Sequence, residues 1–307
     1  MVVCVDFISV SRILHSSTSQ LSNRKIEIMG LREMSNLQQR VIAAIIAVPF
    51  LLFCVLFSDY TFLGLFLLIG VAAQLEFYKL VGSISDNLPL TFYGTFCGVV
   101  LHLLTFFIEK GEIAYSNYYI LSPLLALIFF IKLYNAKDEK PFKNIAYTFL
   151  GIIYVALPFA LLTVLAFLKN ETYDPQIILG CLFLLWASDS GAYFAGTKFG
   201  KTKLFERVSP KKSWEGSIGG LIAAMIVAYV LSMYYTNYES WQWFGIGIII
   251  VVAGTYGDLV ESLFKRSINI KDSADTIPGH GGFLDRFDGL LLSIPFIITF
   301  LKLFPKL

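Results

Sequence analysis

The segment SLFKRSINIKDSADTIPGHGGFLDRFDGLLLSIPF, residues 262–296, places a dense group of polar side chains between two long apolar stretches. Its charged or titratable members are Lys265, Arg266, Lys271, Asp272, Asp275, His280, Asp285, Arg286 and Asp288. The Pro-Gly-His-Gly-Gly run at 278–282 cannot continue a regular helix, because proline breaks it and glycine adopts conformations that other residues resist. The segment therefore predicts a polar connection between two apolar helices.

The composition excludes a large water-soluble protein. Of the 307 residues, 56% are hydrophobic and 15% are charged, whereas soluble domains have about 25% charged residues. The mean hydropathy is +0.70. We therefore predict an all-α, polytopic integral membrane protein, and the net charge of +2 gives no indication of nucleic-acid binding.

Nine stretches are candidates for membrane-spanning helices, each of which needs about 20 mostly apolar residues. They are residues 41–57, 60–80, 90–108, 118–134, 145–168, 177–197, 216–236, 242–264 and 287–304. Because the first and the fourth are short, we expect about nine spans. Residues 1–33 are weakly patterned and are expected to form a disordered N-terminal extension, with the transmembrane domain at 34–307.

Lysine and arginine are distributed unevenly between the connections. With a cytoplasmic N-terminus, 20 of the 24 basic residues fall on the inside, as the positive-inside rule requires. This bias predicts an odd number of spans and an outside C-terminus. It also places residues 262–296 in the cytoplasm.

Three places combine carboxylates with apolar sequence, where ionisable residues are costly and mark functional candidates. They are the sixth span, one helical face of the eighth span, and the start of the ninth span, where a helix N-terminus favours anions. The residues are Asp189 in the first place, Asp258, Glu261, Ser262 and Lys265 in the second, and Asp285 with Asp288 in the third. All three places lie at the cytoplasmic ends of their spans.

Carboxylates that converge on one side suit Mg²⁺, which proteins hold with one or two carboxylates together with substrate phosphates. Basic residues beside a metal are typical of phosphoryl chemistry, in which charge develops on phosphate oxygens. A second basic connection, residues 196–220, holds Lys198, Lys201, Lys203, Arg207, Lys211 and Lys212. Its charge has an alternative explanation in membrane topology and attraction to anionic lipid headgroups.

Structural alternatives stay open for several of these residues. Asp189 could be a hydrogen-bonding hub, and His280 could cap a turn. Asp258 and Asp285 could form interhelical ion pairs with Lys265 and Arg286. Glu76 could pair with Lys79, three residues further along its helix.

The segment at 262–288 resembles the signature of the phosphatidate cytidylyltransferases, also called CDP-diacylglycerol synthases. That signature runs S-x-x-K-R, four residues, K-D, then P-G-H-G-G-x-x-D-R-x-D, and every fixed position is present. The stretches ASDSGAYFAGTKFGKTKL and SPKKSWEGSIGG are similar to two further blocks of the family. The resemblance extends from about residue 36 to the C-terminus.

The resemblance implies a polytopic helical enzyme that condenses CTP with phosphatidic acid, giving CDP-diacylglycerol and pyrophosphate. It implies Mg²⁺, with K⁺ beside it, and metal ligation by Asp258 and Asp285, to which we add Asp189. We expect catalytic roles for Lys265, Arg266, Lys271, Asp272, Arg286 and Asp288. We expect substrate contacts from Lys211, Lys212, Ser213, Glu215, Gly279, His280, Gly281 and Gly282.

The expected setting is the bacterial inner membrane, with the site facing the cytoplasm, membrane lipids as surroundings and a homodimer as a candidate assembly. A CTP-dependent lipid or polyprenol kinase is an alternative that would transfer the γ-phosphate instead. An ion-coupled transporter is a second alternative, but it predicts internal repeats and a site at the membrane midplane. The sequence has no evident repeat, and its charges gather at one face.

Deleting residues 1–33 is expected to leave cytidylyltransferase activity within about twofold of the full chain, since surface segments without packed contacts contribute little. The measurement is turnover of the truncated chain in membranes with matched protein levels. Loss of membrane insertion or of turnover would show that the extension is required.

Overall fold

The computed structural model describes residues 36–84, 87–169, 172–268 and 282–305. The chain divides into two units, residues 50–277 with 281–307, here called the main unit, and residues 1–49 with 278–280. Of the second unit, residues 36–49 are described, as the first part of a helix. The expectation of a disordered extension at 1–33 lies outside the described residues.

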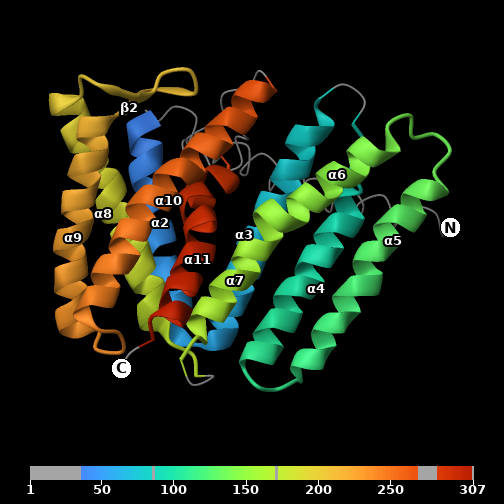
Figure 1. Ribbon diagram of the computed structural model, residues 1–307, viewed down its shortest axis with the longest axis horizontal. Helices are drawn as coiled ribbons and strands as arrows, with labels where there is room; N and C mark the ends of the chain where they lie inside the picture. Colours follow the sequence, from blue (N-terminus) through green and yellow to red (C-terminus); the bar gives the residue numbers. More distant parts are fainter. Residues whose placement is uncertain (1–35, 85–86, 170–171, 269–281, 306–307) are drawn as a thin grey trace, which may run out of the picture. The chain divides into compact units, whose positions relative to one another are not determined.

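The described chain is almost entirely helical, which confirms the all-α class (Figure 1). In chain order the helical segments are α2 (Asn36–Phe57), α3 (Asp59–Gly82), α4 (Thr91–Glu109), η1 (Tyr115–Ile120), α5 (Leu121–Leu133), α6 (Pro141–Gly151), η2 (Ile152–Ala156), α7 (Leu157–Ala166), α8 (Pro175–Phe199), α9 (Trp214–Tyr234), α10 (Ser240–Ser267) and α11 (Leu284–Leu303). Each expected span overlaps one helix or one continuous run of helical segments. The fifth span combines α6, α7 and, between them, the wider turn of π-helix η2.

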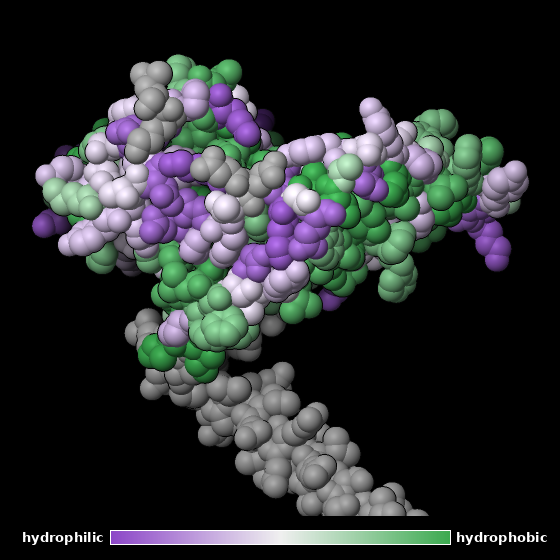
Figure 2. Space-filling model, turned by 90° about the horizontal axis from the view of Figure 1, so that it is seen from below, coloured by the Kyte–Doolittle hydropathy of each residue, from purple (hydrophilic) through white to green (hydrophobic). Residues whose placement is uncertain are grey.

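Seven helical stretches among the described residues are long and apolar enough to cross a membrane. The apolar part of α2, Ala44–Phe57, is shorter, and α11 is not among the seven. The count of nine spans therefore stays a prediction. Figure 2 looks onto the end of the main unit at which α9 connects to α10, and hydrophilic residues gather in a band across this end, flanked by hydrophobic residues. This distribution fits a protein whose polar residues gather at this end of its apolar helices.

Local capping explains where several helices begin. The Ser58 hydroxyl accepts a hydrogen bond from the Tyr60 N–H at the start of α3, and the Asp174 carboxylate accepts one from Gln176 at the start of α8. At the start of α9 the Ser213 hydroxyl accepts a hydrogen bond from the Gly216 N–H over 3.2 Å. These short polar side chains satisfy N–H groups that the helix itself leaves without partners.

A short β-hairpin joins α8 to α9, and the sequence analysis did not predict it. Strands β1 (Lys203–Phe205) and β2 (Ser209–Ser213) pair antiparallel, with Lys203 opposite Ser213. Strands of three and five residues are too short to give a readable alternation of apolar and polar side chains. The hairpin carries four of the six basic residues of the 196–220 connection, namely Lys203, Arg207, Lys211 and Lys212, and it ends at Ser213, which caps α9.

Glycines bring the helices of the site into close contact. A Cβ atom at Gly191 of α8 would lie 2.6 Å from the Gly219 carbonyl oxygen of α9, so glycine permits the close approach of these two helices. A Cβ atom at Gly257 of α10 would lie 2.5 Å from the Asp288 carbonyl oxygen of α11. Gly257 immediately precedes Asp258, so this approach sets the carboxylates of α10 beside those of α11.

Helix α11 also packs against α3 and α7. The Phe287 ring lies 6.2 Å from Phe66 of α3 and 5.7 Å from Phe159 of α7, between ring centroids. Figure 1 shows α11 between α10 and α7, and the described contacts agree. The first turn of α11 is therefore held by α10, α3 and α7 together.

Gly257→Ala is expected to lower the free energy of unfolding by about 1–3 kcal/mol, because the added methyl group overpacks the contact between α10 and α11. The matched control is Gly64→Ala on α3, where a Cβ atom would meet nothing within 4 Å. The control should be neutral or stabilising, since alanine favours helix more than glycine. Thermal unfolding in detergent measures both, and equal stability of the two variants would contradict the close approach at Gly257.

Candidate active site

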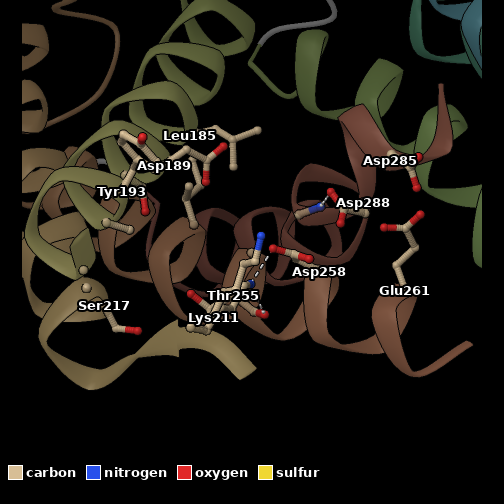
Figure 3. A pocket seen from close by; sticks show the side chains of 18 of the residues that line it. Leu185, Asp189, Tyr193, Lys211, Ser217, Thr255, Asp258, Glu261, Asp285 and Asp288 are labelled. Carbon is tan, nitrogen blue, oxygen red and sulfur yellow. Dashed lines mark hydrogen bonds and ion pairs between the residues drawn. The ribbon is translucent and has the colours of Figure 1, made fainter. Parts of the chain in front are cut away.

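A cavity of about 540 Å³ opens where the C-terminal parts of α8 and α10, strand β2, and the first turns of α9 and α11 meet (Figure 3). This volume is in the range of small-molecule sites. Its lining includes ten residues that the sequence analysis selected: Asp189, Lys211, Lys212, Ser213, Asp258, Glu261, Lys265, Asp285, Arg286 and Asp288. The three acidic places expected to converge do lie together in the fold.

Three carboxylates form the centre of this cavity. One carboxylate oxygen from each of Asp258, Glu261 and Asp288 lies within 4.8 Å of the other two. Asp258 and Glu261 are one turn apart on α10, and Asp288 comes from α11, directly after its first turn. Here we call these three residues the acidic cluster. Glu261 was absent from the expected ligands, although its position three residues after Asp258 on one helical face was the signal that pointed to it.

Two lysines offset the negative charge. The Lys212 ammonium of β2 lies 2.5 Å from the Asp258 carboxylate. The Lys265 ammonium lies 3.2 Å from Glu261 and 2.9 Å from Asp285. The ion-pair alternative is therefore present for Asp285, with Lys265 as its partner, whereas Asp258 pairs with Lys212 of the hairpin.

Asp285 is held by more than one donor. Besides Lys265, the Gly282 N–H donates a hydrogen bond to its second carboxylate oxygen over 3.1 Å. In this arrangement Asp285 fixes the backbone at the start of α11 and orients Lys265. It does not belong to the acidic cluster, and its role as a metal ligand stays a prediction.

The donor set of the acidic cluster fits a hard divalent cation. Carboxylate oxygens are the ligands that Mg²⁺ takes in proteins. The Glu261 side chain is almost fully buried, and its Oε1 atom has no hydrogen-bond partner among the described residues. A buried oxygen without a partner is costly, and a cation among these three carboxylates would satisfy it.

Asp189 lines the cavity from α8, on the other side of Asp258 from α11 (Figure 3). It lies within electrostatic range of Asp258, Lys212 and Arg286. Within the described residues it accepts no hydrogen bond, so the alternative of a structural hub finds no support there. Its assignment as a third metal ligand stays a prediction.

The remaining residues that the sequence analysis expected in the site lie partly at the cavity and partly away from it. Ser213 is buried, and its hydroxyl is engaged in capping α9. Glu215 lies outside the cavity lining, where its carboxylate accepts the Thr202 N–H over 3.1 Å and ties the hairpin to α9. Arg266 is exposed and also lies outside the lining. Lys271, Asp272, Gly279, His280 and Gly281 lie outside the described residues.

Several polar residues of the cavity were missed by the sequence analysis. These are Ser188, Tyr193, Ser217 and Thr255. Tyr193 is four residues after Asp189, and Thr255 is three residues before Asp258, so helical periodicity places each on the face of an expected residue. Ser217 follows the hairpin by one turn of α9, and no local pattern marks it.

Comparison with known proteins gives the family. A model of the cytidylyltransferase family matches residues 38–304. A phosphatidate cytidylyltransferase of Haemophilus influenzae is 34% identical over 286 residues, covering 86% of this chain and 98% of that protein. One of Staphylococcus haemolyticus is 36% identical over 180 residues, covering 58% of this chain and 67% of that protein. With this coverage, and with Lys265, Asp285, Arg286 and Asp288 of the signature lining one cavity, the chain belongs to the cytidylyltransferase family.

Proposed function

We propose that this protein is a phosphatidate cytidylyltransferase, which condenses CTP with phosphatidic acid to give CDP-diacylglycerol and pyrophosphate. One observation carries the proposal: a cluster of carboxylates and a set of basic side chains face one cavity at the ends of apolar helices. Relatives that carry this name cover most of the chain. Both substrates are anions, so a site that joins them must supply positive charge.

The basic side chains and a helix terminus would hold CTP. Lys211 and Lys212 line the cavity from β2, and Gly216 and Ser217 line it from the first turn of α9. A helix N-terminus presents N–H groups and a partial positive charge to phosphate. The triphosphate would therefore bind between β2 and α9, with Arg286 contributing from α11.

The acidic cluster would hold the divalent cation, for which we propose Mg²⁺, with K⁺ as a companion ion implied by the family resemblance. When bound, the cation would neutralise charge on the triphosphate and on the departing pyrophosphate. Lys212 and Lys265 hold Asp258, Glu261 and Asp285 in place. The carboxylates would thus be oriented before substrate arrives.

The reaction is a substitution at the α-phosphorus of CTP. A phosphate oxygen of phosphatidic acid forms a bond to that phosphorus, and the bond from the phosphorus to the bridging oxygen breaks, so that pyrophosphate leaves with the electron pair. The side chains of the cavity bind and orient the two anions, which is the main source of catalysis in reactions of this kind.

The chain would carry out this reaction at a membrane surface. Helix α9 has an apolar stripe of Ile218, Ile222 and Ile226, each more than half exposed, which is the face expected toward lipid. Trp214, at the start of α9 beside the cavity, is also exposed, as interfacial tryptophans are. The lipid phosphate would therefore reach the cavity at headgroup depth. A bacterial inner membrane and a homodimer stay predictions.

Product analysis with labelled CTP tests the proposal. Purified protein in phosphatidate-containing vesicles with Mg²⁺ should transfer label from the α-phosphate of CTP into lipid, and label at the γ-phosphate should appear in pyrophosphate. A CTP-dependent lipid kinase would instead place the γ-label in lipid and release CDP. Either that result or no lipid labelling by well-folded protein would contradict the proposal.

Asp258→Asn is expected to lower turnover about 100-fold or more, because it removes one charge from a cation site in a reaction between anions. It should also weaken Mn²⁺ binding, measured by electron paramagnetic resonance without substrate. The control is Asp174→Asn at the start of α8, since asparagine caps a helix as well as aspartate does. Equal Mn²⁺ affinity and equal turnover in the two variants would contradict the assignment of Asp258 as a cation ligand.

Orientation is tested by labelling single cysteines. A cysteine replacing Lys203 of β1 is expected to react with a membrane-impermeant thiol reagent only from the cytoplasmic side, because CTP cannot cross a bilayer. One replacing Glu112, in the connection of α4 to α5 at the opposite end of the helices (Figure 1), should react only from the outside. Cys54, Cys97 and Cys181 are buried, and Cys4, which lies outside the described residues, is replaced by serine in both variants to keep background labelling low. Labelling of both positions from one side would contradict the arrangement.

A further inference from the structure

Helix α11 carries Asp285 and Asp288, yet it has no capping side chain of its own. The residue before it, Phe283, has φ −65° and ψ −37° and makes no side-chain capping bond. The sequence Gly-Phe-Leu-Asp at 282–285 offers no serine, threonine, aspartate or asparagine at the usual capping position. The Arg286 N–H donates a hydrogen bond to the Phe283 carbonyl over 3.2 Å, whereas the Leu284 N–H at the first helical position needs a partner from elsewhere in the fold.

Glu76 of α3 supplies one of those partners from 208 residues away in the sequence. Its Oε2 atom accepts a hydrogen bond from the Leu284 N–H over 3.1 Å. The Glu76 side chain is buried, and its Oε1 atom has no hydrogen-bond partner among the described residues. Glu76 and Lys79, both among the described residues, do not form an ion pair. The pairing suggested by their spacing in the sequence is therefore not the arrangement found.

A carboxylate is well suited to this position. An anion at a helix N-terminus interacts favourably with the helix dipole, and its hydrogen bond to a backbone N–H is charge-assisted. A buried carboxylate is costly to retain without a partner, so burying one here for packing alone would be unfavourable. The placement of Glu76 is therefore specific to the first turn of α11.

Helix α3 also contacts the other helix that carries the acidic cluster. Phe77, next to Glu76, stacks on Phe264 of α10 with ring centroids 5.2 Å apart and an angle of 24°. On α11, Phe287 lies against Phe66 of α3. Through these contacts α3 bridges α10, which holds Asp258 and Glu261, to the turn of α11 that holds Asp288.

We propose that Glu76 is a positioning residue of the active site: by capping α11 from α3, it fixes the first turn of α11 and so sets Asp288 against Asp258 and Glu261. Glu76 does not line the cavity, so it would act through α11 and without touching a substrate there. The proposal rests on the proposed function for its catalytic consequence, whereas the capping contact stands by itself.

The experiment compares four variants with the wild-type chain. Glu76→Leu removes the acceptor, Glu76→Gln keeps an oxygen acceptor without the charge, and Glu76→Asp keeps the charge but shortens its reach. The matched control is Gln74→Leu, which removes another buried polar side chain of α3 whose hydrogen bonds go to Tyr78 and to Gly94 of α4. Each variant is checked by thermal unfolding in detergent.

Two measurements need no substrate. Hydrogen exchange followed by mass spectrometry on the peptide covering residues 282–291 reports the Leu284 N–H, and electron paramagnetic resonance reports Mn²⁺ binding. The third is the Mg²⁺ concentration for half-maximal turnover. In Glu76→Leu the exchange rate and the half-maximal Mg²⁺ concentration should each rise about tenfold, as for loss of one charge-assisted hydrogen bond. Mn²⁺ binding should weaken in parallel.

The exchange rate and the half-maximal Mg²⁺ concentration of Glu76→Gln should be closer to those of the wild type than to those of Glu76→Leu. Gln74→Leu should lose stability without changing exchange at Leu284 or the Mg²⁺ response. If Glu76→Leu does not fold, Glu76→Asp should show the same rises. Glu76→Leu or Glu76→Asp with lowered stability but unchanged exchange and unchanged Mn²⁺ and Mg²⁺ responses would overturn the proposal. A wild-type chain that makes no CDP-diacylglycerol would refute the proposed function alone, since exchange and Mn²⁺ binding are measured without substrate.

Discussion

The constraint on which the rest of the structure depends is mutual repulsion among carboxylates held together at the ends of apolar helices. Asp258, Glu261 and Asp288 have carboxylate oxygens within 4.8 Å of one another. Like charges at this distance are unfavourable unless opposite charge is close. Lys212 and Lys265 supply part of that charge. A bound cation would supply more positive charge. Binding of the cation would therefore also stabilise the packing of the helices that carry these carboxylates.

Much of this arrangement could be predicted from local sequence. Asp258, Glu261 and Lys265 fall on one helical face because of their spacing alone, and the structure places all three on the cavity wall. The lysine and arginine distribution placed the ends of three expected helices on one side, and their carboxylates do meet. Apolar length located each helix within a few residues, since a membrane span needs a minimum run of apolar side chains.

Contacts between distant segments could not be predicted in the same way. Nothing in the local sequence pairs Lys212 with Asp258 or places Glu76 at the start of α11, because such contacts depend on how the helices pack. The sequence suggested Lys79 for Glu76, a neighbour by helical spacing, and the packing of α3 against α11 provided a different partner. The β-hairpin was also missed, since its strands are too short to show a period.

The measurement that tests the central claim most directly is the position of Mn²⁺ in crystals of the protein, located by anomalous diffraction. The account predicts a peak within coordination distance of at least two of Asp258, Glu261 and Asp288, lost in crystals of the Asp258→Asn variant. A peak held by Asp189 and Asp285 without these three, or no peak at saturating Mn²⁺, would contradict it.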